Sequence, residues 1–404
     1  MNDVLAVVGG VYRETCEFPI WDSVFGSAGR AAALLAHHHP LTLHSVTSPG
    51  FSERLAYLLR GTTHRATLKF TPAEQGVTFE YLHALGSPTY YPDPAPQRPR
   101  LTVEADNILK FGALEFDTVT RCRRLVYDPQ NSHPEPHDAG GASADQVVYV
   151  LNHIQARSMT GQENLQDAAV TILENPAIRA VIIKRGVFGA DLFEQGQPAV
   201  QIGSYPTDGV FKIGSGDVFS AAFALFWMIN DLSLPQAARF ASAATAQYVE
   251  TRDVRITLEQ LTARLSAVEP FYIPEEDIPS LGRVYVAAPF FNLSQRWLVE
   301  EIVTFFEKER IPYFSPFHDV GRGSQKSLGE QDLEALNNCR TVFGWVDDMD
   351  PGTLLELGYA RRLGLNTYTY AYDVSQTHRM MFDALNCRNY GDLAAALYNA
   401  VWNR

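Results

Sequence analysis

Two short stretches of this sequence place an acidic residue beside glycine in patterns that suit catalysis. The first is Gly214-Ser215-Gly216-Asp217, directly before a strongly apolar run. The amides of such a turn, together with those of the helix that follows, form an anion pocket, and the carboxylate beside them can take a proton from an attacking hydroxyl. The simpler alternative is that Asp217 only caps a buried helix.

The second stretch is Asp350-Pro-Gly-Thr-Leu-Leu-Glu356, which we interpret as a loop entering a helix over residues 353–363. In the first turn of that helix, the positive helix end would keep the Glu356 carboxylate ionised. An ionised carboxylate at the end of a parallel sheet can attack an anomeric carbon. The structural alternative is that Thr353 and Glu356 form a capping box.

These residues need rigid elements to position them, and the hydrophobic pattern predicts such elements. Apolar runs of strand length alternate with helical patterns through most of the chain, for example the strand at 180–184 and the helix at 217–229. This alternation predicts an α/β fold with a parallel sheet covered on both faces. Residues 66–99 break the pattern with short strands and prolines, which indicates a small β excursion.

A proline-rich and acidic segment near residues 270–279 divides the chain, and strand–helix alternation restarts at 284–287. We therefore predict a first domain over 1–269, a linker over 270–281 and a second domain over 282–404. The second domain is long enough for one small α/β unit.

Composition limits the classes of function. The 404 residues carry 46 Asp and Glu against 33 Lys and Arg, a net charge of −13, and 46% are hydrophobic. This excludes a disordered acidic chain and argues against nucleic acid or membrane as a partner. Four scattered cysteines, with no CxxC pair, suggest neither a zinc site nor a disulfide framework. We expect a soluble, cytoplasmic homo-oligomer with a small-molecule partner and no metal ligated by its side chains.

The Gly214–Asp217 turn resembles the C-terminal signature of the PfkB carbohydrate and nucleoside kinases. Supporting stretches follow the order of that family: 26–36, 150–161 and 181–192. The resemblance implies a ribokinase-like three-layer sandwich with a small β lid, and ATP and Mg²⁺ as cofactors. It makes Asp217 the general base and implies sets of binding residues: Gly214, Ser215 and Gly216 in the anion hole, Lys184 and Gly186 near the nucleotide, and Glu14, Gly26 and Arg30 on the sugar side.

Several residues depart from that family's pattern. Glu14 stands where a shorter acid is usual, and Arg30 stands where Asn is usual. Gln155 and Phe211 replace two acids, one of which helps to organise Mg²⁺ and phosphate. These departures support an alternative in which the first domain binds a nucleoside or nucleotide without phosphorylating it.

Residues 282–404 resemble the nucleoside 2-deoxyribosyltransferases, on the strand 284–291, the segment 315–317 and the acidic positions. The resemblance implies a flavodoxin-like or Rossmann-like parallel-sheet domain that needs no cofactor. Glu356 would attack C1′ of the sugar and Tyr285 would position it, while Asp350 and Asp332 would handle protons at the leaving base.

Three aromatic residues of this domain, Phe290, Phe291 and Phe317, either form a slot for a flat base or pack in the core. The family's C-terminal Asn has no clear counterpart near 377–381, where Arg379 would suit a 5′-phosphate. Cleavage of a nucleotide and base exchange on a nucleoside therefore both remain open.

Together these features predict a bifunctional enzyme of nucleoside or nucleotide metabolism. The second domain would cleave or exchange the N-glycosidic bond of a nucleoside, a deoxynucleoside or a 5′-monophosphate. The first would phosphorylate a nucleoside or sugar with ATP. The alternative is a non-catalytic first domain that senses a nucleotide or nucleoside and gates a hydrolase in the second.

Overall fold

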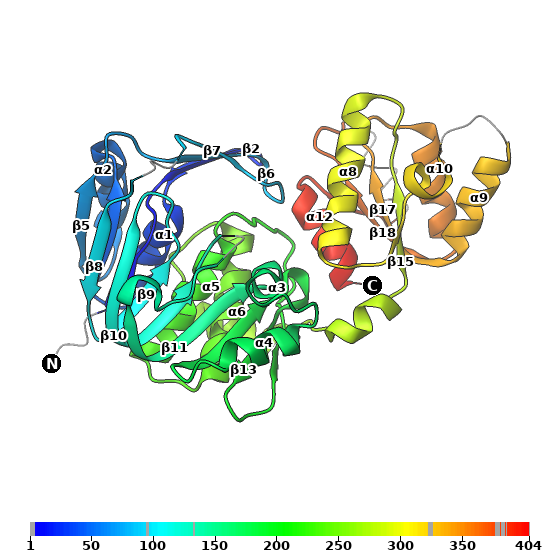
Figure 1. The fold of residues 1–404 in the computed structure, drawn as a ribbon. Helices are drawn as coiled ribbons and strands as arrows, with labels where there is room; N and C mark the ends of the chain where they lie inside the picture. The colour runs from blue at the N-terminus through cyan, green and yellow to red at the C-terminus, as the bar shows by residue number, and fades with distance from the viewer. Residues whose placement is uncertain are drawn as a thin grey trace. The chain divides into compact units, whose positions relative to one another are not determined.

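The computed structural model describes residues 5–93, 97–131, 134–321, 326–375, 380, 384 and 386–403. The chain forms two compact units (Figure 1). The first comprises Met1–Tyr205 and Lys212–Tyr272, and the second comprises Pro206–Phe211 and Ile273–Arg404. The short segment Pro206–Phe211 is part of the second unit, where Asn399 Nδ2 donates a 3.0 Å hydrogen bond to the Thr207 carbonyl oxygen.

A ten-stranded sheet forms the centre of the first unit, in the order β14-β13-β12-β11-β10-β9-β1-β4-β5, with β8 paired to β10. It is parallel from β5 to β12, and β13 and β14 add an antiparallel edge. The strands are β1 Leu5–Val8, β4 Leu41–Thr47, β5 Ala66–Pro72, β8 Arg100–Glu104, β9 Asn107–Phe111, β10 Asp117–Asp128, β11 Ser143–Asn152, β12 Ile178–Lys184, β13 Ala190–Glu194 and β14 Val200–Ile202.

Helices cover both faces of this sheet, as the strand–helix alternation predicts. They are α1 Gly26–Leu35, α2 Pro49–Leu58, α3 His153–Thr160, α4 Leu165–Leu173, α5 Ser215–Ala224, α6 Leu234–Thr251 and α7 Leu258–Ala267. Successive residues of a strand face opposite sides. On β10, Asp128 faces α5, where Ser220 donates to it, and Tyr127 faces the core that α3 and α4 complete.

A separate four-stranded sheet forms the lid, in the order β3-β2-β6-β7. Its strands are β2 Arg13–Phe18, β3 Trp21–Val24, β6 Thr78–His83 and β7 Thr89–Tyr91. The excursion expected over 66–99 therefore needs a correction, because its first strand, β5, pairs with β4 along seven residues of the main sheet. The lid instead recruits β2 and β3, whose strand character the hydrophobic pattern did not indicate.

The second unit is a five-stranded parallel sheet in the order β16-β15-β17-β18-β19. Its elements are β15 Arg283–Ala287, α8 Leu293–Lys308, β16 Tyr313–Phe314, α9 Lys326–Asn337, β17 Cys339–Trp345, α10 Pro351–Arg362, β18 Asn366–Tyr370, β19 Arg388–Tyr390 and α12 Leu393–Trp402. Side chains from α9 and α10 close the core on one face of the sheet. On α8 and α12, the rings of Phe305 and Tyr398 are 5.6 Å apart.

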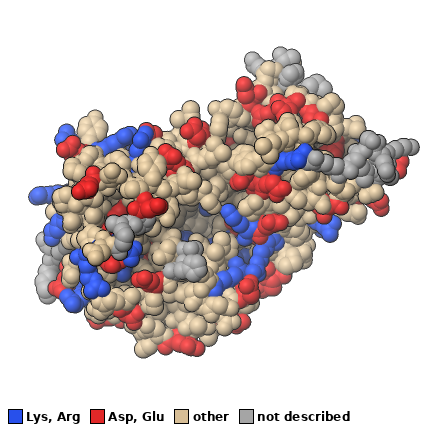
Figure 2. Space-filling view, turned by 45° about the horizontal axis from the view of Figure 1, so that its top comes forward, with Lys and Arg blue, Asp and Glu red and all other residues tan. Residues whose placement is uncertain are grey.

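The expected architecture is confirmed: an α/β unit with a mixed sheet and a small β lid, followed by a smaller parallel-sheet unit. On the face drawn in Figure 2, acidic and basic side chains are interspersed rather than separated into one basic region. Within the part of the chain that the structure describes, no helix is both long and apolar enough to cross a bilayer.

Candidate active sites

Two glycines allow α1 and α5 to approach the strands at the candidate kinase-like site. Gly26 begins α1 with φ +65°, and a Cβ there would lie 2.5 Å from the Gly10 carbonyl oxygen. Gly214 is the N-cap of α5 with φ 77°, a left-handed conformation that glycine adopts without steric cost. A Cβ on Gly214 would also lie 2.1 Å from Arg30 Cζ. The turn is therefore packed directly against the Arg30 guanidinium.

Arg30 contacts both Glu14, the acid expected on the sugar side, and Asp217, the expected general base. Its side chain is fully buried on α1. Nη1 donates to Asp217 Oδ2 at 2.6 Å and to Glu14 Oε1 at 3.1 Å, and Nη2 donates to Glu14 Oε2. The rings of Phe25 and Tyr248 also lie against the guanidinium. The Arg30 guanidinium thus binds both buried carboxylates, that of Glu14 and that of Asp217.

The Asp217 carboxylate is held on both oxygens. Gln130 Nε2 donates to Oδ1 at 3.1 Å, opposite the Arg30 contact on Oδ2. Burial raises the pKa of Asp217 to about 6, while Arg30 acts in the opposite direction. Each oxygen keeps a second acceptor site, so Asp217 can still accept a substrate proton, although the charge of Arg30 opposes it.

The expected phosphate-binding residues do lie together. Lys184 Nζ is 3.3 Å from the position that a Cβ on Gly216 would take, so the ammonium faces the turn. Lys184 also donates to Asp128 Oδ2 at 3.0 Å. The early amides of α5, including that of Gly216, have no acceptor within the helix. Gly186 begins a short 3-10 turn, separated from the end of β12 by Arg185 alone.

Gln155 has a structural function in this unit. Asn152 and Gln155 form a reciprocal capping box at the start of α3, with two 2.8 Å bonds. The Gln155 amide nitrogen donates to the Asn131 carbonyl oxygen at 3.1 Å. Phe211 is buried, with 1% of its surface exposed, in the segment before the glycine turn.

Sequence reasoning missed two residues of this site, Asp128 and Gln130. Asp128 ends the buried strand β10 and accepts from both Lys184 and Ser220. Its position supplied a signal, since ligands of open α/β sheets bind at the carboxyl ends of the strands. Gln130 carried no comparable signal, because its contact with Asp217 spans 87 residues.

In the second unit, the helix that carries Glu356 begins earlier than expected. α10 starts at Pro351, and Asp350 is its N-cap, accepting from the Thr353 amide at 2.8 Å and from the Thr353 hydroxyl at 3.0 Å. Glu356 is therefore the sixth residue of the helix, so the expectation that it lies in the first turn is wrong. The capping box of Thr353 and Glu356 does not form, because Asp350 takes the cap.

Glu356 lies beside Tyr285 of β15, whose hydroxyl donates to Glu356 Oε1 at 2.8 Å. Tyr285 is fully buried and its ring stacks on Phe314 at 5.5 Å, so the donor is fixed. Burial, followed by the charge of Glu356, raises the pKa of Tyr285, which keeps the phenol protonated. This contact places one carboxylate oxygen and leaves the other for chemistry.

Three acids converge on this site. Burial raises the pKa of Glu356 to about 8, and the charges of Asp332 and Asp350 act in the same direction, against the hydrogen bond from Tyr285. Asp332 on α9 has a buried Oδ1 without a hydrogen-bond partner in the described structure, and burial raises the pKa of this acid as well. The expectation that the helix end keeps Glu356 ionised is wrong, because burial and neighbouring acids favour its neutral form.

The three candidate base-stacking residues form a cluster that solvent reaches in part. Phe290 lies 5.5 Å from Phe291 and 5.4 Å from Phe317 between ring centroids. Phe291 is 69% exposed. Arg379, the candidate phosphate ligand, lies outside the described residues.

Two family models match parts of the chain. The model described as pfkB family carbohydrate kinase matches residues 126–261, and the model for nucleoside 2-deoxyribosyltransferase matches residues 284–390. The first unit is therefore similar to the PfkB carbohydrate kinases, and the second is similar to the nucleoside 2-deoxyribosyltransferases. Both families are families of enzymes.

Solved structures agree with the PfkB-like assignment at the level of fold. The ribokinase of Arabidopsis thaliana, complexed with ribose and ATP, is 18% identical and has a TM-score of 0.52, covering 66% of this chain and 99% of its own. A putative ribokinase from Agrobacterium tumefaciens is 14% identical with a TM-score of 0.50, covering 66% and 98%. No curated protein matches the chain.

Proposed function

We propose that the deoxyribosyltransferase-like unit cleaves or exchanges the N-glycosidic bond of a nucleoside, a deoxynucleoside or a 5′-monophosphate, with Glu356 as the nucleophile. The observation that carries this proposal is the 2.8 Å hydrogen bond from Tyr285 to Glu356, with Asp332 and Asp350 near enough to shift the pKa of the same carboxyl group. A group of acids with raised pKa values can keep one proton for donation while another member is ionised.

In the first step, the Glu356 oxygen that Tyr285 does not hold attacks C1′ of the sugar. The C1′–N bond breaks, and its electron pair goes to the base nitrogen, which takes a proton from Asp332. Positive charge that develops on the sugar favours the ionised form of Glu356 at this moment. The product is a glycosyl ester on Glu356 and a free base.

In the second step, water or the nitrogen of another base attacks C1′, and the electron pair of the C1′–O bond returns to Glu356. The ionised Asp332 takes the proton that the attacking group releases. Attack by water gives hydrolysis, and attack by a base gives exchange. Asp350, held by Thr353, keeps the start of α10 in place throughout.

The test is to trap the intermediate. A slow 2′-fluoro nucleoside analogue should leave a sugar adduct that peptide mass spectrometry finds on Glu356. A parallel panel of nucleosides and monophosphates, with and without a second base, distinguishes exchange from hydrolysis by chromatography. An adduct on another peptide would contradict the assignment.

A second proposal concerns the PfkB-like unit: it binds a nucleoside or nucleotide and gates the glycosidic reaction, with no kinase turnover of its own. The contact between Arg30 and Asp217 favours it over the kinase alternative, since the expected general base is already engaged by a buried cation. A buried ion pair is costly to break on one side only.

The residues near Gly216 suit the phosphates of ATP, because Lys184 and the early α5 amides face the same place. Bound ATP would supply a transferable phosphoryl group there. The acids of this site suit Mg²⁺ poorly, because each is already paired with a cation. Asp128 is paired with Lys184, and Glu14 and Asp217 are paired with Arg30.

The test uses the full chain. Wild-type protein should bind ATP or a nucleoside calorimetrically but show no ATP consumption with a panel of nucleosides and sugars, while the ligand changes the rate of base release. Lys184→Met should lose ATP binding. ATP-dependent phosphorylation that Asp217→Asn lowers by at least about 10²-fold would restore the kinase alternative.

A further inference from the structure

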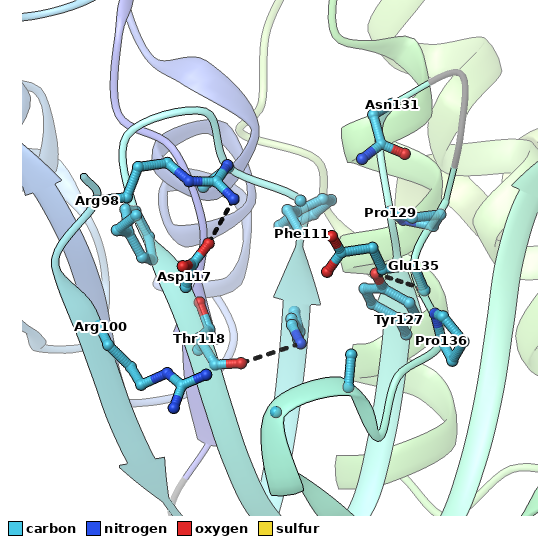
Figure 3. Close-up of a pocket in the computed structure, with 16 residues that line it drawn as sticks. Arg98, Arg100, Phe111, Asp117, Thr118, Tyr127, Pro129, Asn131, Glu135 and Pro136 are labelled. Atoms are coloured by element: carbon cyan, nitrogen blue, oxygen red, sulfur yellow. Dashed lines mark hydrogen bonds and ion pairs between the residues drawn. The ribbon is translucent and has the colours of Figure 1, made fainter. Parts of the chain in front are cut away.

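We propose that the PfkB-like unit carries a second ligand site, separate from the glycine turn, for a small polar anion such as a phosphate or a carboxylate. The site is a cavity of about 210 Å³ between β8, β9 and β10 and the segment that follows β10 (Figure 3). Tyr127 lines the cavity, whereas the neighbouring Asp128 faces α5. The two sites therefore lie on opposite faces of the sheet.

The cavity has a topological origin. Neighbouring parallel strands usually need a helical crossover of a dozen or more residues. Here residues 112–116 alone join β9 to β10, and the described part of 129–142 holds only a short 3-10 turn, Ala139–Gly141. β10 also pairs with β8 through its first half and with β9 through its second. Loops therefore cover this face where a helix would normally fill it.

Lys110 is the residue that points most clearly to an anion. Its side chain lines the cavity and the residue is only 9% exposed. Nζ has a long 3.4 Å contact to the Thr118 carbonyl oxygen and lies 5.0 Å from the Tyr127 ring centroid, with no ion pair to a carboxylate of the described chain. Burial lowers the pKa of Lys110, partly offset by Glu135. A bound anion would compensate this buried ammonium.

Two arginines add to the positive charge of the cavity. Arg98 is held by Asp117 at 2.6 Å. Arg100 Nη2 lies 2.9 Å from the place that a Cβ on Gly140 would take, so the missing side chain makes room for the guanidinium. Figure 3 shows both arginines across the cavity from Tyr127 and Glu135. The two arginines and Lys110 face two acids of the lining, Asp117 and Glu135. The lining therefore carries one net positive charge.

The polar surface of the cavity and its size define the rest of the ligand. Phe111, Phe116, Pro129 and Pro136 line the cavity together with Tyr127, but most of the surface that faces it belongs to polar atoms. Its volume of about 210 Å³ is below the ~300–1,000 Å³ of clefts that hold drug-sized ligands. A small polar molecule with one anionic group fits these limits.

The binding test compares inorganic phosphate, acetate and neutral glycerol by titration calorimetry on the full chain. We expect saturable binding of one or both anions, and their ratio distinguishes a phosphate from a carboxylate ligand. Lys110→Met keeps the apolar stem and should weaken anion binding at least about 10-fold, the effect of one charge-assisted hydrogen bond. Lys69→Met, at an exposed lysine on β5, is the matched control and should bind as wild type.

A second measurement locates the site without relying on a variant that folds. Acylation of lysines in wild-type protein, followed by mass spectrometry, should show that the anion protects Lys110 and leaves Lys69 reactive. Absence of saturable binding for both anions would overturn the proposal. Protection of Lys184 with Lys110 unprotected would do so too, because it places the anion at the glycine turn.

Discussion

At the residue scale, Glu356 is the side chain on which the proposed chemistry depends. Glu356→Gln keeps the acceptor oxygen for Tyr285, so the local geometry should persist. Base release should nevertheless fall by several orders of magnitude, because an amide forms no glycosyl ester. Steady-state chromatography of the free base measures this. A Glu356→Gln protein with wild-type activity would leave Glu356 without a catalytic role.

The raised pKa of Glu356 also predicts a pH dependence. Glu356 must be ionised while Asp332 holds a proton, so kcat/KM for base release should have a bell-shaped pH profile, with one limb near the Glu356 pKa of about 8. A pH–rate profile checks this. Asp332→Asn should remove one limb of the bell, and a wild-type profile with no limb near pH 8 would contradict the raised pKa of Glu356.

The same shift also affects stability. The folded-state pKa is raised from 4.5 to about 8, so the stabilisation from protonated Glu356 is present below pH 4.5 and is lost as the pH rises through about 8. Glu356→Gln does not titrate. Its melting temperature should fall less than that of wild type over this range, as calorimetry can show.

At the scale of elements, α10 depends on its N-cap. Asp350→Ala should destabilise the second unit by about 1 kcal/mol, because the Thr353 amide loses its acceptor. Asp350→Asn keeps the cap and removes the charge. Denaturant unfolding of the two variants separates the roles: a loss of activity in Asp350→Asn at wild-type stability would add a chemical role to the structural one.

The pairing of α1 with α5 rests in part on Arg30. Arg30→Met leaves the buried carboxylates of Glu14 and Asp217 without their cation, and should cost about 3–5 kcal/mol in the free energy of unfolding. Adding Glu14→Gln removes one of the two orphaned charges and should recover part of this loss. An unchanged denaturation midpoint in the single variant would mean that water reaches these acids.

At the scale of the whole molecule, each unit has a hydrophobic core of its own. Calorimetric unfolding should therefore show two transitions rather than one. Phe343→Ala, in the fully buried middle of β17, should lower one transition by about 3–5 kcal/mol of stability, and Phe223→Ala on α5 should lower the other. A single transition that both variants shift equally would show that the units unfold together.

The sequence by itself determined the elements and the motifs. Alternating apolar runs predicted two α/β units, and local spacing located Gly214–Asp217 and the Asp350–Glu356 stretch. These are short-range properties, because strand and helix periodicity and turn chemistry depend on neighbouring residues. The exact start of a helix was not predicted, and it matters for the cap. Because α10 starts at Pro351, its N-cap is Asp350 rather than Thr353.

Only the tertiary structure decided how the acids are used. Arg30 meets Glu14 across 16 positions and Asp217 across 187, and Tyr285 meets Glu356 across 71. No local pattern specifies such contacts. Burial likewise depends on what packs above a residue. The raised pKa of Glu356 and the burial of the Lys110 ammonium, which has no ion pair among the described residues, therefore follow from the folded chain and not from neighbouring positions in the sequence.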